Sequence, residues 1–337
     1  MSGALERAVS GELFSRAEMR ALVLEIMTGA LSDLQIAALL AALRTRGETL
    51  DEVVGAAEAL RALALPLPEA PAGAIDTCGT GGDGANTFNI STVSALVVAG
   101  AGVPVAKHGN RAASSRCGSA ELLEALGVAI EIPPLRMASA VREVGIGFLY
   151  ARACHPAMAR VAPVRAALGI RTLFNRLGPL TNPMRVRRQL VGVAAAALVE
   201  PTLAALVALG AECVWVVYGE DGLDELSLSA PTRVAAYADG RTERFIVGHG
   251  EFVPVASRAE IAGGDAAENA RIARAVLAGE KFAPRDAVLL NSAAALCVAG
   301  RARDLPEGVR LAAESLDAGR ANALLERFIS FTTAVSP

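Results

Sequence analysis

The sequence predicts an α/β protein in which a small all-helical N-terminal domain precedes a larger domain with a central, mostly parallel sheet. Helical spacing of apolar residues fills residues 1–65. The Pro- and Gly-rich stretch 66–73 is typical of a linker. Over 74–337 short apolar runs alternate with Ala- and Leu-rich stretches, as in sheets covered by helices. The length of 337 residues suits about two domains.

Three capping boxes place the helix starts of the N-terminal domain. Ser15, Ser32 and Thr49 are each followed three residues later by Glu or Gln. In such a box the hydroxyl accepts a backbone N–H at the helix start, while the later side chain reaches back to the capping residue. Gly47 suits the end of the helix that begins after Ser32.

The composition excludes several classes of protein. With 32 Lys+Arg against 35 Asp+Glu, the net charge of −3 provides no basic surface for nucleic acid or anionic lipid. No apolar run reaches the roughly 18 residues that span a bilayer. Five scattered Cys indicate neither a disulfide framework nor a thiolate zinc site, and acidic residues interrupt any N-terminal signal peptide. We therefore expect a cytoplasmic protein that binds neither nucleic acid nor membrane.

A glycine-rich loop follows the first predicted strand of the larger domain. Four glycines lie within residues 79–84, where the missing Cβ atoms let backbone N–H groups approach an anion closely. Asn89, Ser91 or Thr92 can cap the apolar helix that follows, whose N-terminus also favours phosphate. A glycine loop that merely turns the chain is the alternative.

The same glycines formally match the dinucleotide fingerprint G-x-G-x-x-G. In that motif the last glycine lies in the helix, and an acidic residue about 20 positions later holds the ribose. Here the helix starts later, no acid stands near position 100, and Asp83 inside the loop would repel a pyrophosphate in the absence of a cation. A nicotinamide site is therefore not favoured, and no P-loop sequence is present.

A second strand–loop–helix unit follows, with a predicted strand at 103–106 and a loop at 107–118. The loop is rich in cations and hydroxyls, as in a phosphate clamp, namely Lys107, Arg111, Ser114, Ser115 and Arg116. Ser119 can cap the helix predicted at 120–126. One such loop alone is equally well a solvated turn. Two loops at the C-terminal ends of adjacent strands converge on one crevice and favour a polyphosphorylated ligand.

A third loop, after the strand predicted at 214–218, is acidic and contains Glu220, Asp221, Asp224 and Glu225. Alone it would be a solvated turn. Opposite two phosphate loops it favours Mg²⁺, which binds through one or two carboxylates together with substrate phosphates.

The remaining motifs give fewer indications. A further strand is expected at 287–290, and residues 171–190, with Arg185, Arg187 and Arg188, are an excursion from the α/β domain. The three His are not spaced as metal ligands, and no nucleophile–base set can be assembled. The reaction therefore depends on positioning and charge neutralisation more than on proton transfer.

Taken together, these motifs resemble the anthranilate phosphoribosyltransferases of tryptophan biosynthesis along nearly the whole chain. The matching motifs are CGTGGDG at 78–84, NIST at 89–92, KHGNRAASSRCGSAELLEALG at 107–127, HPAM at 155–158, VRAALGIRTLFNRLGPLTNP at 164–183 and GLDELSLSAPT at 222–232. The resemblance implies a nucleoside-phosphorylase-like fold and a homodimer formed through residues 1–65, with 171–190 also packing there. It implies transfer of the 5-phosphoribosyl group from phosphoribosyl pyrophosphate to anthranilate, with Mg²⁺ as cofactor.

The resemblance also assigns residues to the substrates and the metal. For phosphoribosyl pyrophosphate it implies Gly79, Gly82, Asp83, Thr87, Asn89, Ile90, Ser91, Thr92, Lys107, His108, Gly109, Asn110, Arg111, Ala112, Ala113, Ser114, Ser115 and Ser119. For anthranilate it implies Gly79, Asn110 and Arg165, and for Mg²⁺ it implies Ser91, Asp224 and Glu225. No side chain is expected to act as an acid or base. Three departures, Glu121, Arg152 and Arg176, remove none of these ligands.

Two other functions remain open. A pyrimidine nucleoside phosphorylase would share the fold, but the acidic loop and the sequence around Arg165 speak against it. A non-enzymatic nucleic-acid-binding relative would need a basic face, which the net charge of −3 does not favour.

Overall fold

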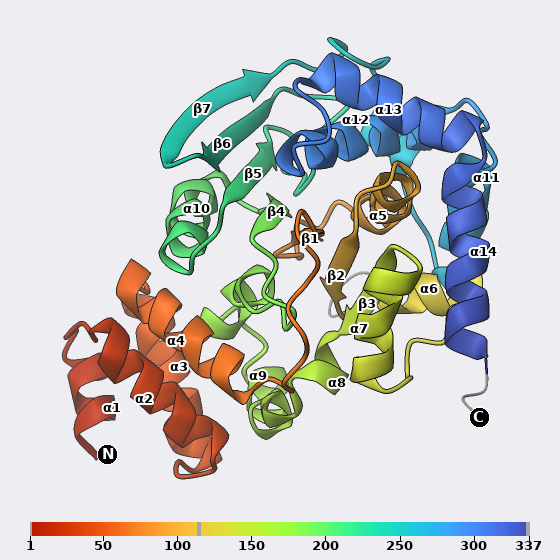
Figure 1. Cartoon of the computed structure of the whole chain (residues 1–337). Coiled ribbons are helices and arrows are strands. Elements are labelled where there is room, and N and C mark those ends of the chain that lie inside the picture. The colour runs from red at the N-terminus through yellow and green to blue at the C-terminus, as the bar shows by residue number, and fades with distance from the viewer. Residues whose placement is uncertain (1, 113–115, 335–337) are drawn as a thin grey trace.

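The computed structural model describes residues 2–112 and 116–334, and two domains are evident in it (Figure 1). The small domain contains α1 (Ser2–Val9), α2 (Arg16–Met27), α3 (Asp33–Arg46) and α4 (Leu50–Leu63). The larger domain begins with β1 (Ile75–Gly79), α5 (Ile90–Gly100), β2 (Val105–Gly109), α6 (Ser119–Leu126), α7 (Pro134–Glu143) and β3 (Ile146–Tyr150).

Short helical segments lead from there back to the sheet. They are α8 (Ala151–Cys154), η1 (Pro156–Arg160), α9 (Ala162–Leu168), η2 (Leu173–Arg176) and η3 (Gly178–Leu180). The chain continues through β4 (Arg188–Gly192), η4 (Ala196–Leu198), α10 (Val199–Ala208), β5 (Cys213–Gly219), β6 (Thr232–Ala238), β7 (Arg241–Val247) and η5 (Arg258–Ile261). It ends in α11 (Ala266–Leu277), α12 (Ala283–Val298), α13 (Leu305–Asp317) and α14 (Arg320–Thr333).

The sheet has seven strands in the order β3-β2-β1-β4-β5-β6-β7. The first five are parallel, and β6 and β7 add an antiparallel edge. This confirms the predicted fold class of a small helical domain and an α/β domain with a mostly parallel sheet. Because β1 and β2 are adjacent and parallel, the loops that follow them leave the sheet at the same end.

Two hydrophobic cores cover opposite faces of the sheet. On one face α5 and the C-terminal helices α11 to α14 pack their Ala, Val and Leu side chains. On the other face α10 joins the strands to the helical domain in a single core, so that α4 and α10 lie side by side in Figure 1. No helix in the described part of the chain is long and apolar enough to cross a membrane.

The three predicted capping boxes are confirmed. The side chain of each capping residue accepts the backbone N–H three positions later. In return, the later side chain accepts the backbone N–H of the capping residue, and the pairs are Ser15 with Glu18, Ser32 with Gln35, and Thr49 with Glu52. Gly47 ends α3 with a φ of 90°, which favours glycine.

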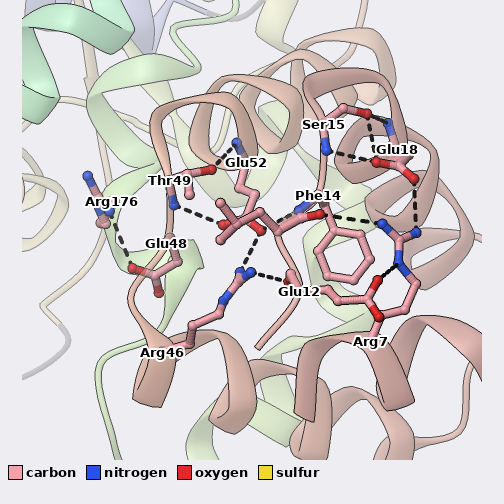
Figure 2. Close-up of polar contacts among 11 residues, drawn as sticks. Arg7, Glu12, Phe14, Ser15, Glu18, Arg46, Glu48, Thr49, Glu52 and Arg176 are labelled. Carbon is pink, nitrogen blue, oxygen red and sulfur yellow. Dashed lines mark hydrogen bonds and ion pairs between the residues drawn. The ribbon is translucent and has the colours of Figure 1, made fainter. Parts of the chain in front are cut away.

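Glu52 also ties the helices to one another (Figure 2). Its side chain is fully buried and accepts hydrogen bonds from the backbone N–H of Thr49 (2.8 Å) and Phe14 (2.9 Å) and from Arg46 (2.5 Å). Burial alone would raise the pKa of Glu52, but these hydrogen bonds lower it overall. The buried carboxylate therefore stays charged and fully paired.

Two predicted strands differ from the structure. Residues 287–290 lie inside α12, which is buried along nearly all of its length, and a short apolar run cannot by itself distinguish a buried strand from a buried helix. The strand predicted at 103–106 is found at Val105–Gly109, because Lys107 and His108 are buried strand residues instead of loop residues. The strand predicted at 214–218 is confirmed within β5.

Residues 171–190 leave the α/β domain and return to it. Leu173, Phe174, Leu177 and Leu180 pack in the same core as the N-terminal helices. The segment then enters the centre of the sheet as β4, between β1 and β5.

Candidate active site

The loops that follow β1, β2 and β5 lie together at the C-terminal end of the sheet. We call residues 80–89, 110–118 and 220–225 the loop cluster; it is described except for 113–115. Asp224 bridges two of these loops, because its Oδ2 accepts the backbone N–H of Gly81 (3.2 Å). Glu225 Oε1 accepts the N–H of Ser91 (3.2 Å) in the first turn of α5.

Two glycines make room for Asp224. Gly79 and Gly192 are paired in register at the ends of β1 and β4. A Cβ at position 79 would lie 2.7 Å from Asp224 Oδ2, and one at position 192 would collide with the Asp224 backbone. Glycine at both positions therefore lets the acidic loop cross the strand ends and reach the glycine loop.

The four carboxylates of the acidic loop fall into two pairs. Asp221 accepts hydrogen bonds from Ser227 (2.7 Å) and Ser229 (2.5 Å), which outweigh its burial and lower its pKa. Glu220 pairs with Arg233. Both side chains stabilise the loop itself and are not available for a ligand, which separates them from Asp224 and Glu225.

Asp224 and Glu225 have no cationic partner within ion-pair distance among the described residues. Burial, followed by the like charge of Asp83, raises the pKa of Asp224 to about 7. Burial and the charge of Asp224 raise the pKa of Glu225 well above its usual value, and Lys107 offsets this only in part. Three carboxylates thus lie close together, and Lys107 compensates their charge only in part.

The glycine loop runs past these carboxylates. Gly81, Gly82 and Gly84 have φ of 63°, 77° and 68°, a backbone region that side-chain-bearing residues rarely adopt. Asp83 turns back on the loop, where its Oδ1 accepts the N–H of Ala85 (3.1 Å). Thr87 makes an isolated bridge to Ala262.

Asn89 is the N-cap residue of α5 but makes no side-chain capping bond, contrary to expectation. Its amide donates to Cys117 O (3.1 Å) and accepts from Asn269 (2.9 Å). At the start of α5 the N–H of Ser91 donates to Glu225, and the N–H groups of Thr92 and Val93 donate to the Asn89 carbonyl. Ile90 and Thr92 are buried in the first turn, and Ser91 is partly exposed.

Lys107 and His108 point to different sides of β2. Lys107 is buried, with its ammonium on Thr77 O and 3.4 Å from Ser91 Oγ, directly beneath the α5 terminus. The His108 ring lies instead beside His155 (5.2 Å between centroids) and Gly178 O (3.1 Å). Burial lowers the pKa of His108 to about 3, so the ring is neutral at physiological pH.

The second loop is held by α6. Glu121 accepts the N–H groups of Ala112 (3.2 Å) and Gly118 (3.1 Å), and so joins the two ends of the loop. The Arg111 guanidinium pairs with Glu124 (2.7 Å) on α6. Ser119 does not cap α6; Gly118 is the N-cap, and Ser119 Oγ donates to Asn110 O (3.1 Å).

The expected residues Ala113, Ser114 and Ser115 lie outside the described residues. Gly109 ends β2, where a Cβ would collide with Ser119 and Phe148. The exposed Asn110 follows it at the mouth of the loop.

Arg165, on α9, is partly buried and incompletely paired. Its Nε is buried and has no hydrogen-bond partner among the described residues. Its guanidinium carbon lies 5.8 Å from the centre of the Phe174 ring, and burial lowers its pKa. A cation on an aromatic face with an unused donor is suited to a planar carboxylate.

Arg171 was not predicted to take part in the site. Its Nη1 donates to Gly81 O (3.1 Å) and Gly82 O (3.2 Å), so it holds the carbonyl side of the glycine loop. Arg171 also stands six residues after Arg165. The segment that carries Arg165 is therefore attached to the glycine loop. A contact that spans 90 residues leaves no local sequence signal.

Asp76 organises the base of the site and was also missed. It is fully buried and accepts from the N–H of His108 (3.1 Å) and from Asn182 (2.9 Å). Burial raises the pKa of Asp76 to about 6, although Lys107 opposes the shift. Nothing in the sequence around Asp76 distinguishes it from an ordinary strand residue.

Comparisons with known proteins agree with this geometry. The family models "Glycosyl transferase family, a/b domain" and "Glycosyl transferase family, helical bundle domain" match residues 72–322 and 2–64. The anthranilate phosphoribosyltransferase of Rubrobacter xylanophilus is 52% identical over 97% of this chain and 96% of its own.

Solved structures of the same kind superimpose over the whole chain. The anthranilate phosphoribosyltransferase of Thermus thermophilus aligns with a TM-score of 0.93 and 46% identity, over 98% of this chain and 99% of its own. The yeast enzyme in complex with phosphoribosyl pyrophosphate and Mg aligns at 0.88 and 28% identity, over 99% and 98%. The yeast enzyme was also solved with 4-fluoroanthranilate (TM-score 0.85, 27% identity, 99% of both chains).

Proposed function

The chain belongs to the glycosyl transferase family and, within it, to the anthranilate phosphoribosyltransferases, and we propose that it performs their reaction at the loop cluster. The 5-phosphoribosyl group of phosphoribosyl pyrophosphate passes to the amine of anthranilate, and pyrophosphate leaves. The observation that supports this site best is the group of incompletely compensated carboxylates, Asp83, Asp224 and Glu225, beside a glycine loop and a helix N-terminus. Such a site binds phosphates when a cation accompanies them.

The glycine loop and the start of α5 hold the pyrophosphate group. Because Arg171 occupies the carbonyls of Gly81 and Gly82, backbone N–H groups of the loop can face the anion. Lys107 supplies positive charge from beneath the α5 terminus. The other residues expected from the family resemblance, including His108 and Arg111, are retained as proposed ligands of phosphoribosyl pyrophosphate.

The donor set suits Mg²⁺. Carboxylate and hydroxyl oxygens of Asp224, Glu225 and Ser91 are hard ligands of the type Mg²⁺ prefers. The described residues contain no cluster of three or more acidic, His or Cys side chains that could hold a metal alone. Mg²⁺ typically binds through one or two carboxylates and completes its shell with substrate phosphates. When bound, Mg²⁺ neutralises charge on the departing pyrophosphate.

Anthranilate is held on the opposite side by Arg165, with Asn110 and Gly79 nearby in the proposed site. The Arg165 guanidinium pairs with the substrate carboxylate and orients the substrate amine. The neutral amine is itself a nucleophile, and the reacting ribose carbon becomes cationic as the leaving group departs. Orientation and charge neutralisation can therefore replace a strong base. The neutral His108 and His155 fit this mechanism, since burial lowers the pKa of both rings.

A fluorescence assay tests the proposed function. Full-length protein is mixed with Mg²⁺, phosphoribosyl pyrophosphate and anthranilate, and the loss of anthranilate fluorescence is followed. We expect loss only when all components are present, and a much slower loss with an Asp224→Asn/Glu225→Gln variant. Turnover of a pyrimidine nucleoside with inorganic phosphate, and no loss of anthranilate, would instead establish the nucleoside phosphorylase alternative.

We further propose that the enzyme is a cytoplasmic homodimer formed through residues 1–65, with 171–190 packing there, and that it contacts neither nucleic acid nor membrane. Exposed leucines and a valine on the helical domain support the dimer, with Leu34 84% exposed and Val9 68% exposed. Light scattering on a Leu34→Glu variant should then give the mass of a monomer. An Ile246→Glu control on β7, also exposed, should remain dimeric. A monomeric parent protein would contradict the dimer and leave the chemistry unaffected.

A further inference from the structure

A cavity of about 300 Å³ lies at the junction of the two domains, and its lining includes no residue of the loop cluster. It is bounded by the end of α4, by the end of α10 and by the segment that leads into β4. In Figure 1 these elements meet where the helical domain joins the sheet. A volume of this size is at the lower end of the range for small-molecule sites.

Positive charge dominates the lining. Arg61, Arg185 and Arg187 all border the cavity, and Glu69 is the only acidic residue among the lining residues. Of the nearby carboxylates, Glu58 pairs with Arg16 (2.5 Å), whereas Glu212 pairs with Arg187 (3.2 Å) and so compensates that one cavity cation. Arg61 and Arg185 therefore border the cavity without an ion pair to a described residue.

Arg61 is fixed in position by the chain around it. Its Nε donates to Leu180 O (2.7 Å) and its Nη1 to Leu209 O (3.2 Å). Its Nη2 has no hydrogen bond to a described residue. Burial, and then the charge of Arg185, lower the pKa of Arg61 to about 10, which reflects positive charges held together.

Arg185 is held in an unusual backbone conformation. Its φ is 53°, in the left-handed region that residues other than glycine seldom occupy. A turn stabilises this conformation, because the Arg185 N–H donates to Asn182 O (3.0 Å) and Asn182 is anchored on Asp76. The Arg185 side chain forms no hydrogen bond or ion pair with the described residues. The exposed Arg185 side chain is therefore free to reach a ligand at the cavity.

We propose that this arginine-lined cavity binds a small molecule that carries a phosphate group. Guanidinium groups match phosphate oxygens in paired hydrogen bonds, and the charges of Arg61 and Arg185 suit a dianion. The site is independent of the reaction proposed for the loop cluster. A phosphate there would connect α4 of the helical domain to the segment that enters β4.

The test is calorimetric titration of the full-length protein at low ionic strength. The probes are inorganic phosphate, pyrophosphate and ribose 5-phosphate, so that a free anion is distinguished from a phosphate group on a larger molecule. Each is titrated in the presence of Mg²⁺ and phosphoribosyl pyrophosphate, to occupy the loop cluster. Arg185→Gln removes one cavity cation without disturbing the carbonyl contacts of Arg61. Arg241→Gln is the matched control, because Arg241 is exposed on β7 and far from the cavity lining.

We expect at least one probe to bind the parent protein and the Arg241→Gln control equally. Its dissociation constant should rise roughly tenfold or more in Arg185→Gln, as expected for one charge-assisted contact. The transfer rate of Arg185→Gln should be unchanged, which distinguishes this site from the loop cluster. Equal binding by both variants, or no binding by the parent protein up to about 10 mM of every probe, would overturn the proposal.

Discussion

The helical domain and the loop cluster both bury carboxylates, but they treat the charge in opposite ways. In the helical domain Glu52 is fully buried, and its oxygens accept two backbone N–H groups and the Arg46 guanidinium. The net effect is a lowered pKa. In the loop cluster Asp224 and Glu225 lie beside Asp83, and the pKa of both is raised.

The Glu52 charge stabilises the fold, whereas the charges of Asp224 and Glu225 are suited to binding a ligand. A buried carboxylate with satisfied hydrogen bonds stabilises the folded state at neutral pH, whereas neighbouring unpaired carboxylates destabilise it. The loop cluster therefore carries an electrostatic cost that the proposed divalent cation would remove on binding. The cost is located where the proposed reaction needs the cation.

The largest effect is expected in the helical domain. Glu52→Gln removes the charge that Arg46 faces in a buried environment, so the free energy of unfolding should fall by about 3 kcal/mol. Urea denaturation measures this loss. Glu12→Gln is the control, because Glu12 pairs with Arg7 at the surface, where solvent screens the interaction, and its loss should be much smaller. Equal losses for the two variants would mean that burial does not distinguish them.

A second prediction concerns Arg165, the residue proposed to bind anthranilate. Arg165→Ala removes charge-assisted hydrogen bonds worth roughly 1.5–3 kcal/mol, which corresponds to about a 10- to 100-fold rise in the KM for anthranilate. The KM for phosphoribosyl pyrophosphate should change little, because Arg165 acts on the other substrate. Initial rates with each substrate varied in turn separate the two effects. A folded variant with the parent dependence on anthranilate would contradict the assignment.

The third prediction tests the metal ligands. Asp224→Asn/Glu225→Gln keeps the shape of both side chains and removes two charges, so the Mg²⁺ concentration for half-maximal rate should rise roughly tenfold or more. Asp221→Asn is the control within the same loop, because Asp221 bonds to Ser227 and Ser229 instead. If both variants show the parent Mg²⁺ dependence, the acidic loop is only a solvated turn.

The smallest effect is expected at Arg171. Arg171→Gln weakens the support of the glycine loop at Gly81 and Gly82 while leaving every proposed ligand in place. We expect kcat/KM for phosphoribosyl pyrophosphate to fall about fivefold, equivalent to about 1 kcal/mol, with little change in the urea midpoint. An unchanged kcat/KM would show that the glycine loop keeps its conformation without this contact.

The features that the sequence predicted correctly depend on residues close together in the chain. The capping boxes at Ser15, Ser32 and Thr49 involve side chains three positions apart, so their chemistry is visible in the sequence. The sheet class followed from periodicity. The apolar run 287–290 was wrongly expected as a strand, because a helix buried on all sides has the same composition.

The candidate site was predictable in composition but not in its internal contacts. Position and residue type indicated the glycine loop and the acidic loop. They did not show that Lys107 is buried in β2, that Arg171 holds the glycine loop, or that Asp76 supports the site from below. Each of these depends on a contact between segments distant in sequence, which only the folded chain brings together.

The pH dependence of stability in metal-free buffer tests most directly whether the loop cluster lacks compensating charge. The pKa of Asp224 is about 7 in the folded protein and about 4 in an unfolded chain. The stabilisation that Asp224 gives the folded protein is therefore fully present below a pH of about 4, and it is lost as the pH rises through about 7. Glu52 behaves in the opposite way, because its pKa is lowered in the folded protein. Its contribution to stability is present at pH values above its ordinary pKa and is lost on acidification.

The decisive measurement compares urea unfolding of the parent protein and the Asp224→Asn/Glu225→Gln variant between about pH 5 and 8. Without Mg²⁺, the parent should lose stability relative to the variant as the pH rises. Added Mg²⁺ should remove that loss in the parent and have little effect on the variant. If the stability of the two proteins changed with pH in parallel, with and without Mg²⁺, the proposal that Asp224 and Glu225 bind the cation would be contradicted.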